Sequence, residues 1–252
     1  MKLIHRSIRF AKKRFANARH RNLVTLPKGR ILISITFDDY PASTRVHATP
    51  LLNEYDAKST FYVCMGLLTK NSNSGRIDSI DGVNSLISQG HEIGCHTYNH
   101  IDCASTPPET VRQDIERNSL AINQLVGTPP TSFAFPFGNY TPATKALAAE
   151  HYNSIRTSEP GINAGTVDLN NLNAIPLYPK TSDDSIKYLL QRARRLESAW
   201  LIFYTHDVSP NPSAWGCSPH LLRHLLDECH AHNIHLTPIS HVARTLRRAA
   251  TL

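Results

Sequence analysis

The stretch Ile31-Leu32-Ile33-Ser34-Ile35-Thr36-Phe37-Asp38-Asp39 decides the fold of this 252-residue chain. An apolar, β-branched run of this length is typical of a buried strand, and two carboxylates follow directly at its carboxyl end. Parallel strands of α/β folds carry functional side chains at that end. The stretch therefore predicts a central strand that delivers Asp38 and Asp39 to a site.

Further apolar runs predict more strands, and helical patterns lie between most of them. With the first run included, they occupy residues 31–37, 59–64, 92–96, 132–137, 154–157, 174–178, 200–205 and 234–239. We expect several helices to begin where Thr or Ser precedes proline, because the hydroxyl caps the first turn and proline fits its first position. These starts are Thr106-Pro107 for a helix to about Gln124, Thr141-Pro142 for 143–151, Ser218-Pro219 for 220–232, and Thr181 or Ser182 for a helix to Arg195.

Strands that alternate with helices imply a parallel sheet. Seven or eight such units predict an α/β fold, an irregular (β/α)7-8 barrel in a single domain, with its site at the carboxyl ends of the strands. We place this domain at residues 29–252, after a basic amphipathic N-terminal segment at residues 1–28. A doubly wound open sheet is the alternative, but no glycine-rich phosphate loop follows a strand.

The positive charge of the chain is concentrated near its N-terminus. Residues 1–30 hold ten of the 27 Lys and Arg residues and no acid, so the remainder has 17 basic against 20 acidic residues. We therefore expect that the body binds no nucleic acid. Apolar residues recur at spacings of three and four within the N-terminal segment. Such a helix can make peripheral contact with a membrane through residues 1–25, or it can be a solvated tail.

Cysteine usage and targeting patterns bear on location. The five cysteines are odd in number and form no C-x-x-C pattern, which favours buried free thiols in a reducing compartment. The N-terminal charges precede no apolar signal core, and no run is long enough to span a bilayer. These patterns predict a cytoplasmic protein, peripheral at the inner membrane face if its N-terminal segment binds lipid.

A pair of histidines, His96 and His100, can act together with the two aspartates at one site. At a spacing of four on a helical turn, both imidazoles face the same way and can reach one ion. If Asp39 joins them, a three-ligand metal site results with a position open for water, and Asp38 is left to act as a base. This pattern predicts metal-assisted hydrolysis. The alternatives are a common Asp-Asp turn and two unrelated histidines among 14.

Two later strand ends offer further groups. The turn Pro136-Phe137-Gly138 can expose the backbone N–H of Phe137 to a developing oxyanion, or it can simply end a strand. His206 follows an apolar run and can act as a general acid, unless Asp207 merely satisfies it. Asp102 is a candidate acceptor for an imidazole N–H.

These motifs, in this order, resemble those of the polysaccharide deacetylases, carbohydrate esterase family 4. The resemblance covers about residues 31–240 and rests on Thr36-Phe37-Asp38-Asp39, His96-Thr97-Tyr98-Asn99-His100, Pro136-Phe137-Gly138 and His206. It implies removal of the acetyl group from an N-acetylated sugar, with a divalent metal as cofactor, Zn²⁺ first among the candidates. It implies that the metal ligands are Asp39, His96 and His100. It implies a catalytic base, an oxyanion donor and a general acid, which are Asp38, Phe137 and His206.

The chain departs from the family pattern in two places. Many members have an arginine two residues before the proline of the third motif, where this chain has Ala134. That arginine orients the base, and our hypothesis is that Arg156 replaces it. The aspartate-tryptophan fourth motif is also missing, which leaves Asp207 or Glu159 to support His206.

Two other functions stay open at this stage. A deformylase or amidase would act on a non-carbohydrate amide through the same metal centre. A catalytically silent sugar-binding protein would keep the fold alone, and Ala134 gives this alternative some weight. The sequence leaves open which sugar is the substrate, which ion binds and which oligomeric state the protein adopts.

Overall fold

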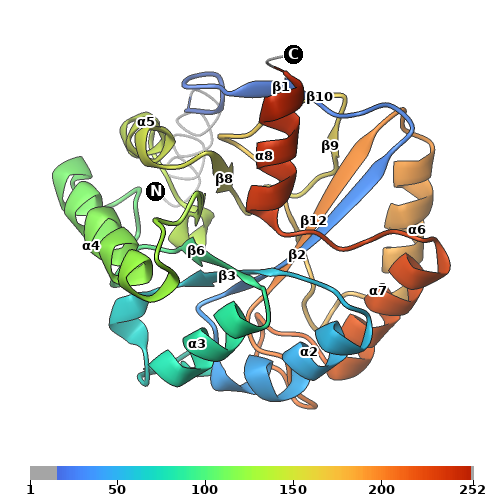
Figure 1. The fold of residues 1–252 in the computed structure, drawn as a ribbon, viewed down its shortest axis with the longest axis horizontal. Coiled ribbons are helices and arrows are strands. Elements are labelled where there is room, and N and C mark those ends of the chain that lie inside the picture. Colours follow the sequence, from blue (N-terminus) through green and yellow to red (C-terminus); the bar gives the residue numbers. More distant parts are fainter. Residues whose placement is uncertain (1–15, 251–252) are drawn as a thin grey trace, which may run out of the picture.

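A computed structural model describes residues 16–250 and shows a curled sheet surrounded by helices (Figure 1). Within these residues seven strands pair in parallel, in the order β11-β12-β2-β3-β6-β7-β8. Their bounds are β2 Ile31–Asp38, β3 Thr60–Val63, β6 Glu92–Cys95, β7 Ser132–Ala134, β8 Ser154–Arg156, β11 Ile175–Pro176 and β12 Ala199–Thr205. The short β9 (Asn163–Ala164) adds to β12 in the antiparallel sense. The predicted α/β fold with an irregular barrel is confirmed.

All but the last of the described helices cover the outside of the sheet, and the last one packs against the inner-face residues Trp200, Ile202 and Tyr204 (Figure 1). They are α2 Ala42–Glu54, α3 Ile80–Ser88, α4 Pro108–Val126, α5 Pro142–His151, α6 Asp183–Arg194, α7 Pro219–Ala231 and α8 Ile239–Ala249. The caps predicted at Thr141, Ser182 and Ser218 are confirmed, since each side chain accepts a backbone N–H of the first turn. Helix α4 begins later than predicted, with Pro107 as its cap. A residue that precedes proline avoids the helical region, so Pro107 before Pro108 cannot be helical.

The barrel is incomplete, because the predicted strand at 234–239 does not form. Those residues contribute one isolated bridge, between Leu236 and Ile33, and α8 already begins at Ile239. Pro238 lacks the N–H that would extend the ladder. The gap between β8 and β11 is spanned by irregular chain, with a single bridge between Arg156 and Leu172.

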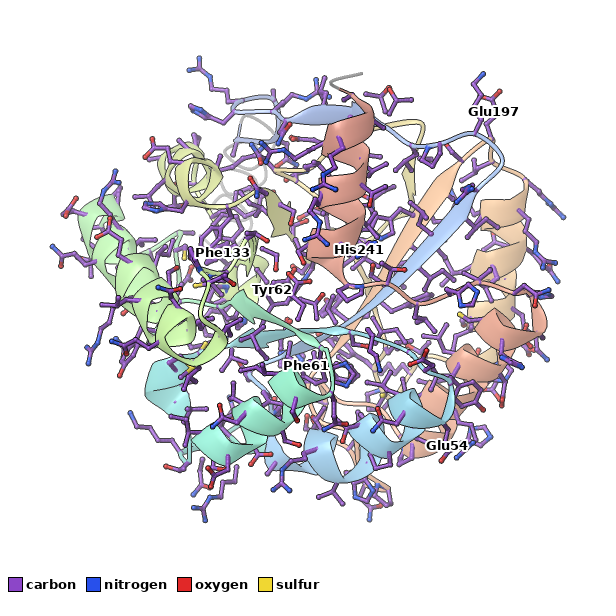
Figure 2. The ribbon with its side chains drawn as sticks, in the orientation of Figure 1. Glu54, Phe61, Tyr62, Phe133, Glu197 and His241 are labelled. Atoms are coloured by element: carbon purple, nitrogen blue, oxygen red, sulfur yellow. The ribbon has the colours of Figure 1, made fainter. Side chains whose placement is uncertain are left out.

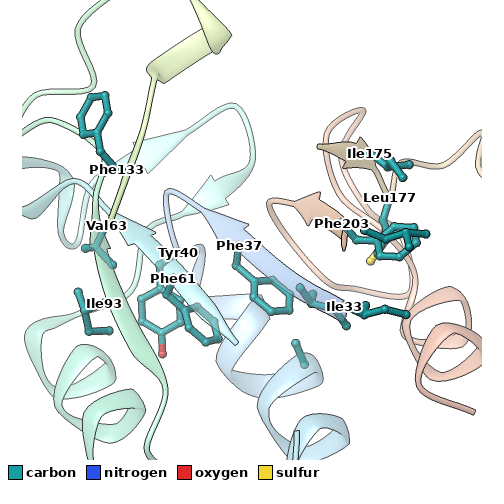
Figure 3. Close-up of a cluster of buried hydrophobic side chains, with 14 of the residues drawn as sticks. Ile33, Phe37, Tyr40, Phe61, Val63, Ile93, Phe133, Ile175, Leu177 and Phe203 are labelled. Atoms are coloured by element: carbon teal, nitrogen blue, oxygen red, sulfur yellow. The ribbon is translucent and has the colours of Figure 1, made fainter. Parts of the chain in front are cut away.

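The outer face of the sheet packs into one large apolar cluster, whereas the inner face carries a second apolar cluster around Trp200 and Ile202 together with polar side chains. Ile33, Ile35 and Phe37 of β2 belong to the large core cluster beneath the helices, and the rings of Phe37 and Phe61 stack at 4.7 Å between centroids (Figure 3). The alternate residues, Ser34 among them, face inward, where Ser34 Oγ accepts the Trp200 indole N–H at 3.0 Å.

Figure 2 shows Tyr62 of β3 near the centre of the molecule, whereas Glu54 and Glu197 lie at its periphery. Towards the carboxyl ends of the strands the interior carries buried polar side chains, Asp38, His96 and Arg156 among them, and buried polar groups need hydrogen-bond partners.

Residues 16–26 pack against the body. Strand β1 (Leu23–Thr25) pairs antiparallel with β10 (Thr166–Asp168). The buried Lys145 ammonium donates to the Arg19 carbonyl at 2.9 Å and to the Asp168 carboxylate at 3.1 Å. Most of the amphipathic pattern assigned to the N-terminal segment falls on residues 1–15, outside the described residues. Among residues 16–250, no helix combines the length and the apolar character needed to cross a membrane.

Candidate active site

A cavity of about 660 Å³ opens at the carboxyl ends of the parallel strands. The side chains that line it come from strand ends and from the loops that follow them, as the barrel architecture predicts. Those that bear on its chemistry are Asp38, Asp39, His96, His100, Phe137, Arg156, Tyr178, Tyr204, His206 and Trp215. The hairpin of β4 (Asn71–Ser72) and β5 (Gly75–Arg76) contributes Ser72, Asn73 and Ser74 to one wall.

The two aspartates leave β2 in different directions. Asp38 is the last residue of the strand, and Asp39 follows with a positive φ of 64°. This turn sends the two carboxylates to different partners although they are adjacent in sequence. Both side chains are buried, and Asp39 Oδ1 has no hydrogen-bond partner.

The histidine pair lies on a loop, so the predicted helical turn is wrong. Strand β6 ends at Cys95, and Thr97 and His100 both have positive φ values, 61° and 54°. The Asp114 carboxylate accepts the backbone N–H groups of residues 98 and 99 at 2.6 and 2.9 Å. In a helical turn these N–H groups would donate to backbone carbonyls. Here the Asp114 side chain accepts them, and the segment forms a loop instead. The imidazole rings of His96 and His100 still meet, with centroids 5.0 Å apart.

Asp39, His96 and His100 form a three-ligand cluster. Asp39 Oδ1 lies 3.3 Å from His100 Nε2 and 3.8 Å from His96 Nε2, and one ligand atom from each residue falls within 4.8 Å of the others. His96 Nδ1 lies 2.7 Å from the Ala134 carbonyl, which can only accept, so the proton is on Nδ1 and the Nε2 lone pair is free. A buried carboxylate oxygen without a partner, facing two imidazole lone pairs, fits a divalent cation.

Burial sets the protonation states that a cation needs. It lowers the pKa of His96 to about 3 and also lowers the pKa of His100, so both rings are neutral at neutral pH. Burial raises the pKa of Asp39 to about 6, and the Asp38 charge adds to the rise, while His206 and Arg156 oppose it. A bound cation favours the charged carboxylate and offsets that rise.

Asp38 pairs with Arg156, the residue that the sequence offered as the replacement arginine. Arg156 Nη2 donates to Asp38 Oδ1, and both side chains are almost fully buried. Burial alone would raise the pKa of Asp38, but Arg156, followed by His96 and His206, holds it below its usual value. Asp38 is therefore an anion in the cavity.

Register explains how an arginine can serve from a different strand. Ala134 of β7 and Arg156 of β8 are parallel partners at the same level of the sheet. Residues at one level of adjacent strands face the same side, so Arg156 reaches the interior where an arginine at 134 would enter. The rings of Tyr62 and Tyr204 flank the guanidinium, with centroids 5.1 and 5.0 Å from its carbon.

Gly94 makes room for this arrangement. A Cβ at that position would lie 2.5 Å from the Tyr62 ring, closer than side chains tolerate. The absence of a side chain on β6 therefore lets Tyr62 lie beside the guanidinium.

Phe137 and His206 both line the cavity. Phe137 has a positive φ of 58°, and its ring packs edge-on against His100 at 4.5 Å. His206 Nδ1 and its backbone N–H both meet the Trp215 carbonyl, at 3.2 and 3.1 Å. Because this carbonyl only accepts, Nδ1 carries the proton and Nε2 is the atom that can exchange one with a substrate.

Two predicted supporting contacts are wrong. Asp207 does not hold the His206 ring: its carboxylate accepts from the backbone N–H and the hydroxyl of Ser213 instead. Asp102 does not hold an imidazole either, since it accepts from Ala104 N and Asn139 Nδ2. In both cases nearby loop donors satisfy the carboxylate first, and sequence spacing does not reveal them.

Several aromatic residues in the cavity wall were not predicted as site residues, Trp215 and Tyr178 among them. Trp215 lies in the loop after β12, and Tyr178 follows β11. Their rings meet edge-on at 5.8 Å, and Tyr178 also faces His206 at 6.3 Å. The only signal in the sequence was a tryptophan inside a polar, proline-containing loop, where burial in the core is not expected.

The sequence resembles known proteins. The sequence profile described as polysaccharide deacetylase matches residues 26–153, which is half of the chain and includes β2, the histidine loop and the Phe137 turn. The chain belongs to the polysaccharide deacetylase family. The match ends before β8, so Arg156 and His206 lie outside it.

Individual relatives and solved structures share a third or less of their aligned residues with this chain. The chain is 32% identical over 105 residues to a peptidoglycan-N-acetylglucosamine deacetylase of Bacillus cereus, covering 41% of this chain and 46% of that protein. The structure of the Streptococcus pyogenes deacetylase PplD in complex with acetate is 26% identical, with a TM-score of 0.54 over 63% of this chain and 68% of that one. A family 4 acetyl xylan esterase of Clostridium thermocellum in complex with a cobalt ion shares the fold, with 19% identity and a TM-score of 0.58 over 84% and 89%.

The chain covers less than half of the length of two of these curated relatives. The chain spans 46% of the B. cereus enzyme and 18% of a bifunctional xylanase/deacetylase of Pseudobutyrivibrio xylanivorans. The family membership supports carbohydrate deacetylation as the chemistry.

Proposed function

We propose that this chain is a divalent-metal-dependent hydrolase that removes the acetyl group from an N-acetylated sugar and releases acetate. One observation carries the proposal. A cluster of one carboxylate and two neutral imidazoles lies beside a second carboxylate, Asp38, which a buried arginine keeps ionised. Hydrolysis of an amide needs both a cation site and a base, and this cavity offers both.

The ligands in this proposal are Asp39, His96 and His100. A divalent ion held there supplies Lewis acidity, which polarises a carbonyl oxygen and makes a neighbouring water more acidic. Two imidazoles and one carboxylate form a donor set common in catalytic zinc sites, so zinc is the ion that we propose.

Asp38 acts on the attacking water, and Phe137 acts on the oxygen that becomes negative. The Asp38 carboxylate takes a proton from the attacking water, whose oxygen forms a bond with the amide carbon. The backbone N–H of Phe137 donates a hydrogen bond to the negative oxygen of the tetrahedral intermediate. Arg156 keeps Asp38 charged and fixed before the attack.

His206 completes the reaction at the leaving nitrogen. In its doubly protonated imidazolium form, with Nδ1–H held by the Trp215 carbonyl, its Nε2 donates a proton to the sugar nitrogen as the carbon–nitrogen bond breaks, which leaves a neutral imidazole, a free amine and acetate. The Trp215 carbonyl fixes the ring through Nδ1 and leaves Nε2 toward the substrate.

A paired product assay tests this function. The purified protein is incubated with N-acetylated sugars in free, polymeric, nucleotide-linked and lipid-linked form, and acetate and new amine are measured together. We expect equal amounts of both products from at least one sugar, and neither from Asp38→Asn. Release of formate from formyl amides instead would assign a deformylase, and sugar binding without any product would assign a silent homologue.

We also propose a reducing compartment and a membrane contact for the protein. All five cysteines are buried and unpaired, which supports a cytoplasmic location. The basic composition of residues 1–25 supports peripheral contact with anionic lipid. Co-sedimentation with vesicles that contain phosphatidylserine, with and without residues 1–15, tests the contact, and equal recovery of both forms would exclude it.

A further inference from the structure

Asp39 lies at the centre of a strained turn. The Tyr40 N–H donates to the Asp38 carbonyl at 2.7 Å, which closes a γ-turn around Asp39, and Asp39 has a positive φ of 64°. A γ-turn whose central residue has a positive φ is the rarer and more strained form. Tyr40 also has a φ of 64°, so two consecutive residues other than glycine occupy the left-handed region. Such a conformation persists only where the surrounding structure holds it.

Tyr40 makes the contacts that hold this turn. It is fully buried, and its ring packs edge-on against Phe61 at 5.4 Å between centroids (Figure 3). Its hydroxyl donates to the Gly82 carbonyl at 3.2 Å, and its own carbonyl accepts the backbone N–H of Asp78 at 3.0 Å. Tyr40 is therefore fixed both at its backbone and at the tip of its side chain, and both polar partners lie around the start of α3.

The segment that receives Tyr40 is itself held in place. Asp78 is buried, and its carboxylate accepts from Arg45 Nε at 2.6 Å and from the Ser79 backbone N–H at 2.7 Å. Gly82 leaves room for that carboxylate, since a Cβ there would lie 2.5 Å from Asp78 Cγ. Arg45 lies on α2, which begins two residues after Tyr40, so the same segment is tied to the chain that follows the turn.

We propose that Tyr40 is a positioning residue for the cation site, because it holds the turn that orients the Asp39 carboxylate toward His96 and His100. This inference rests on the cation site of the proposed function and adds a residue that does not line the cavity. Strand β2 and helix α2 fix the chain on both sides, so a change of φ at Tyr40 must be taken up by Asp39, which moves its carboxylate. A ligand that is held in place before the ion arrives binds it more tightly.

A comparison of alanine with glycine separates the turn from the packing. Tyr40→Ala and Tyr40→Gly lose the same ring and hydroxyl, but only glycine adopts a positive φ without strain. The zinc affinity of the full chain, treated with chelator beforehand, is measured by competition with a chromogenic chelator. We expect both variants to bind zinc more weakly than the parent, and Tyr40→Ala to bind it about tenfold more weakly than Tyr40→Gly.

The same pair of substitutions at Tyr140 is the matched control. Tyr140 is a buried ring whose hydroxyl also donates to a distant segment, at Asn17 Oδ1, but it is not among the residues with positive φ. Tyr140→Ala and Tyr140→Gly should therefore bind zinc with equal affinity.

Equal zinc affinity in Tyr40→Ala and Tyr40→Gly would overturn the positioning role. If Tyr40→Ala does not fold, Tyr40→Phe decides, because it keeps the ring and loses only the hydrogen bond to Gly82. We expect Tyr40→Phe to bind zinc about threefold more weakly than the parent, and parental affinity would overturn the role. A parent protein that takes up no zinc would refute the cation site of the proposed function as well, so the two failures are distinguishable.

Discussion

Moving the buried arginine from one strand to its neighbour is the sharpest perturbation that this structure suggests. Arg156→Met removes the partner of Asp38 and replaces it with an apolar side chain of similar length. Ala134→Arg, added to it, returns a guanidinium at the same level from β7. If the charge beside Asp38 is what matters, and not the strand that carries it, the double variant should recover what the single variant loses.

The expected losses of folding free energy and of kcat follow from the burial of Arg156 and Asp38. Arg156 is 1% exposed and Asp38 is 4% exposed, so the single variant leaves a buried carboxylate without a partner. Breaking a buried ion pair in this way costs about 3–5 kcal/mol of folding free energy. A base that is no longer held ionised should lower kcat by about 100-fold, near the lower end of what general bases contribute. The double variant should return to within about tenfold of the parent kcat, or about 1.4 kcal/mol.

The loss of stability should also depend on pH. In the parent protein Arg156 depresses the pKa of Asp38, so this group stabilises the fold above its ordinary pKa of 3.8 and less as pH falls through that range. In Arg156→Met burial prevails and raises the pKa of Asp38, so that Asp38 stabilises the fold at low pH and destabilises it as pH rises. The gap in stability between parent and variant should therefore be larger at pH 8 than at pH 4, and it should close only as pH falls through the depressed pKa of Asp38 in the parent.

Urea unfolding in the presence of a chelator measures the stability at both pH values, and acetate release from an N-acetylated oligosaccharide measures kcat. Arg156→Lys is the control for charge without the planar guanidinium, and it should lie between the parent and Arg156→Met. A single variant with parental kcat, or a stability gap that is the same at pH 4 and pH 8, would refute the role that we give to Arg156.

Three further predictions concern Asp38, His91 and Lys145. Asp38→Asn should keep one bound ion per chain by elemental mass spectrometry while kcat falls by about 10²–10⁴-fold; loss of the ion together with the rate would instead make Asp38 a ligand. Burial lowers the pKa of His91 from 6.5 to about 4, so folding stability should fall between pH 6.5 and pH 4 by up to about 3 kcal/mol, and His91→Gln should lose that slope in urea unfolding. A variant with an unchanged slope would show that other groups cause it. Lys145→Met removes the ammonium that donates to Asp168 Oδ2 and to two backbone carbonyls, so we expect a loss of about 2–3 kcal/mol and faster proteolysis near residues 16–22, and cleavage at the parental rate would contradict this anchor.

The sequence predicted the site better than it predicted the local structure around it. Asp39, His96 and His100 meet because each follows a parallel strand, and parallel strands end at one edge of the sheet. The helical turn for the histidines was wrong because the loop depends on Asp114, an acceptor far along the chain. A spacing of four describes a helix only when no distant side chain competes for the same N–H groups.

Local sequence patterns also failed at the predicted strand 234–239 and at Trp215. The run at 234–239 has the apolar residues of a strand, but Pro238 cannot donate to a neighbour, and the chain turns into α8. The place of Arg156 beside Asp38 could be proposed because an arginine was missing at 134 and another stood at a strand end. The place of Trp215 in the cavity wall could not, because its loop depends on hydrogen bonds from Ser213 to the Asp207 carboxylate that leave no periodic trace in the sequence.

Zinc titration of chelator-treated protein, with acetate release from an N-acetylated oligosaccharide as the readout, tests the central claim most directly. The rate should rise linearly from near zero and reach its plateau at one ion per chain, whereas Asp39→Asn and His100→Ala should show no rise at the same ratio. Full activity in the chelator, or parental recovery by those two variants, would contradict a reaction that depends on a cation held by Asp39, His96 and His100.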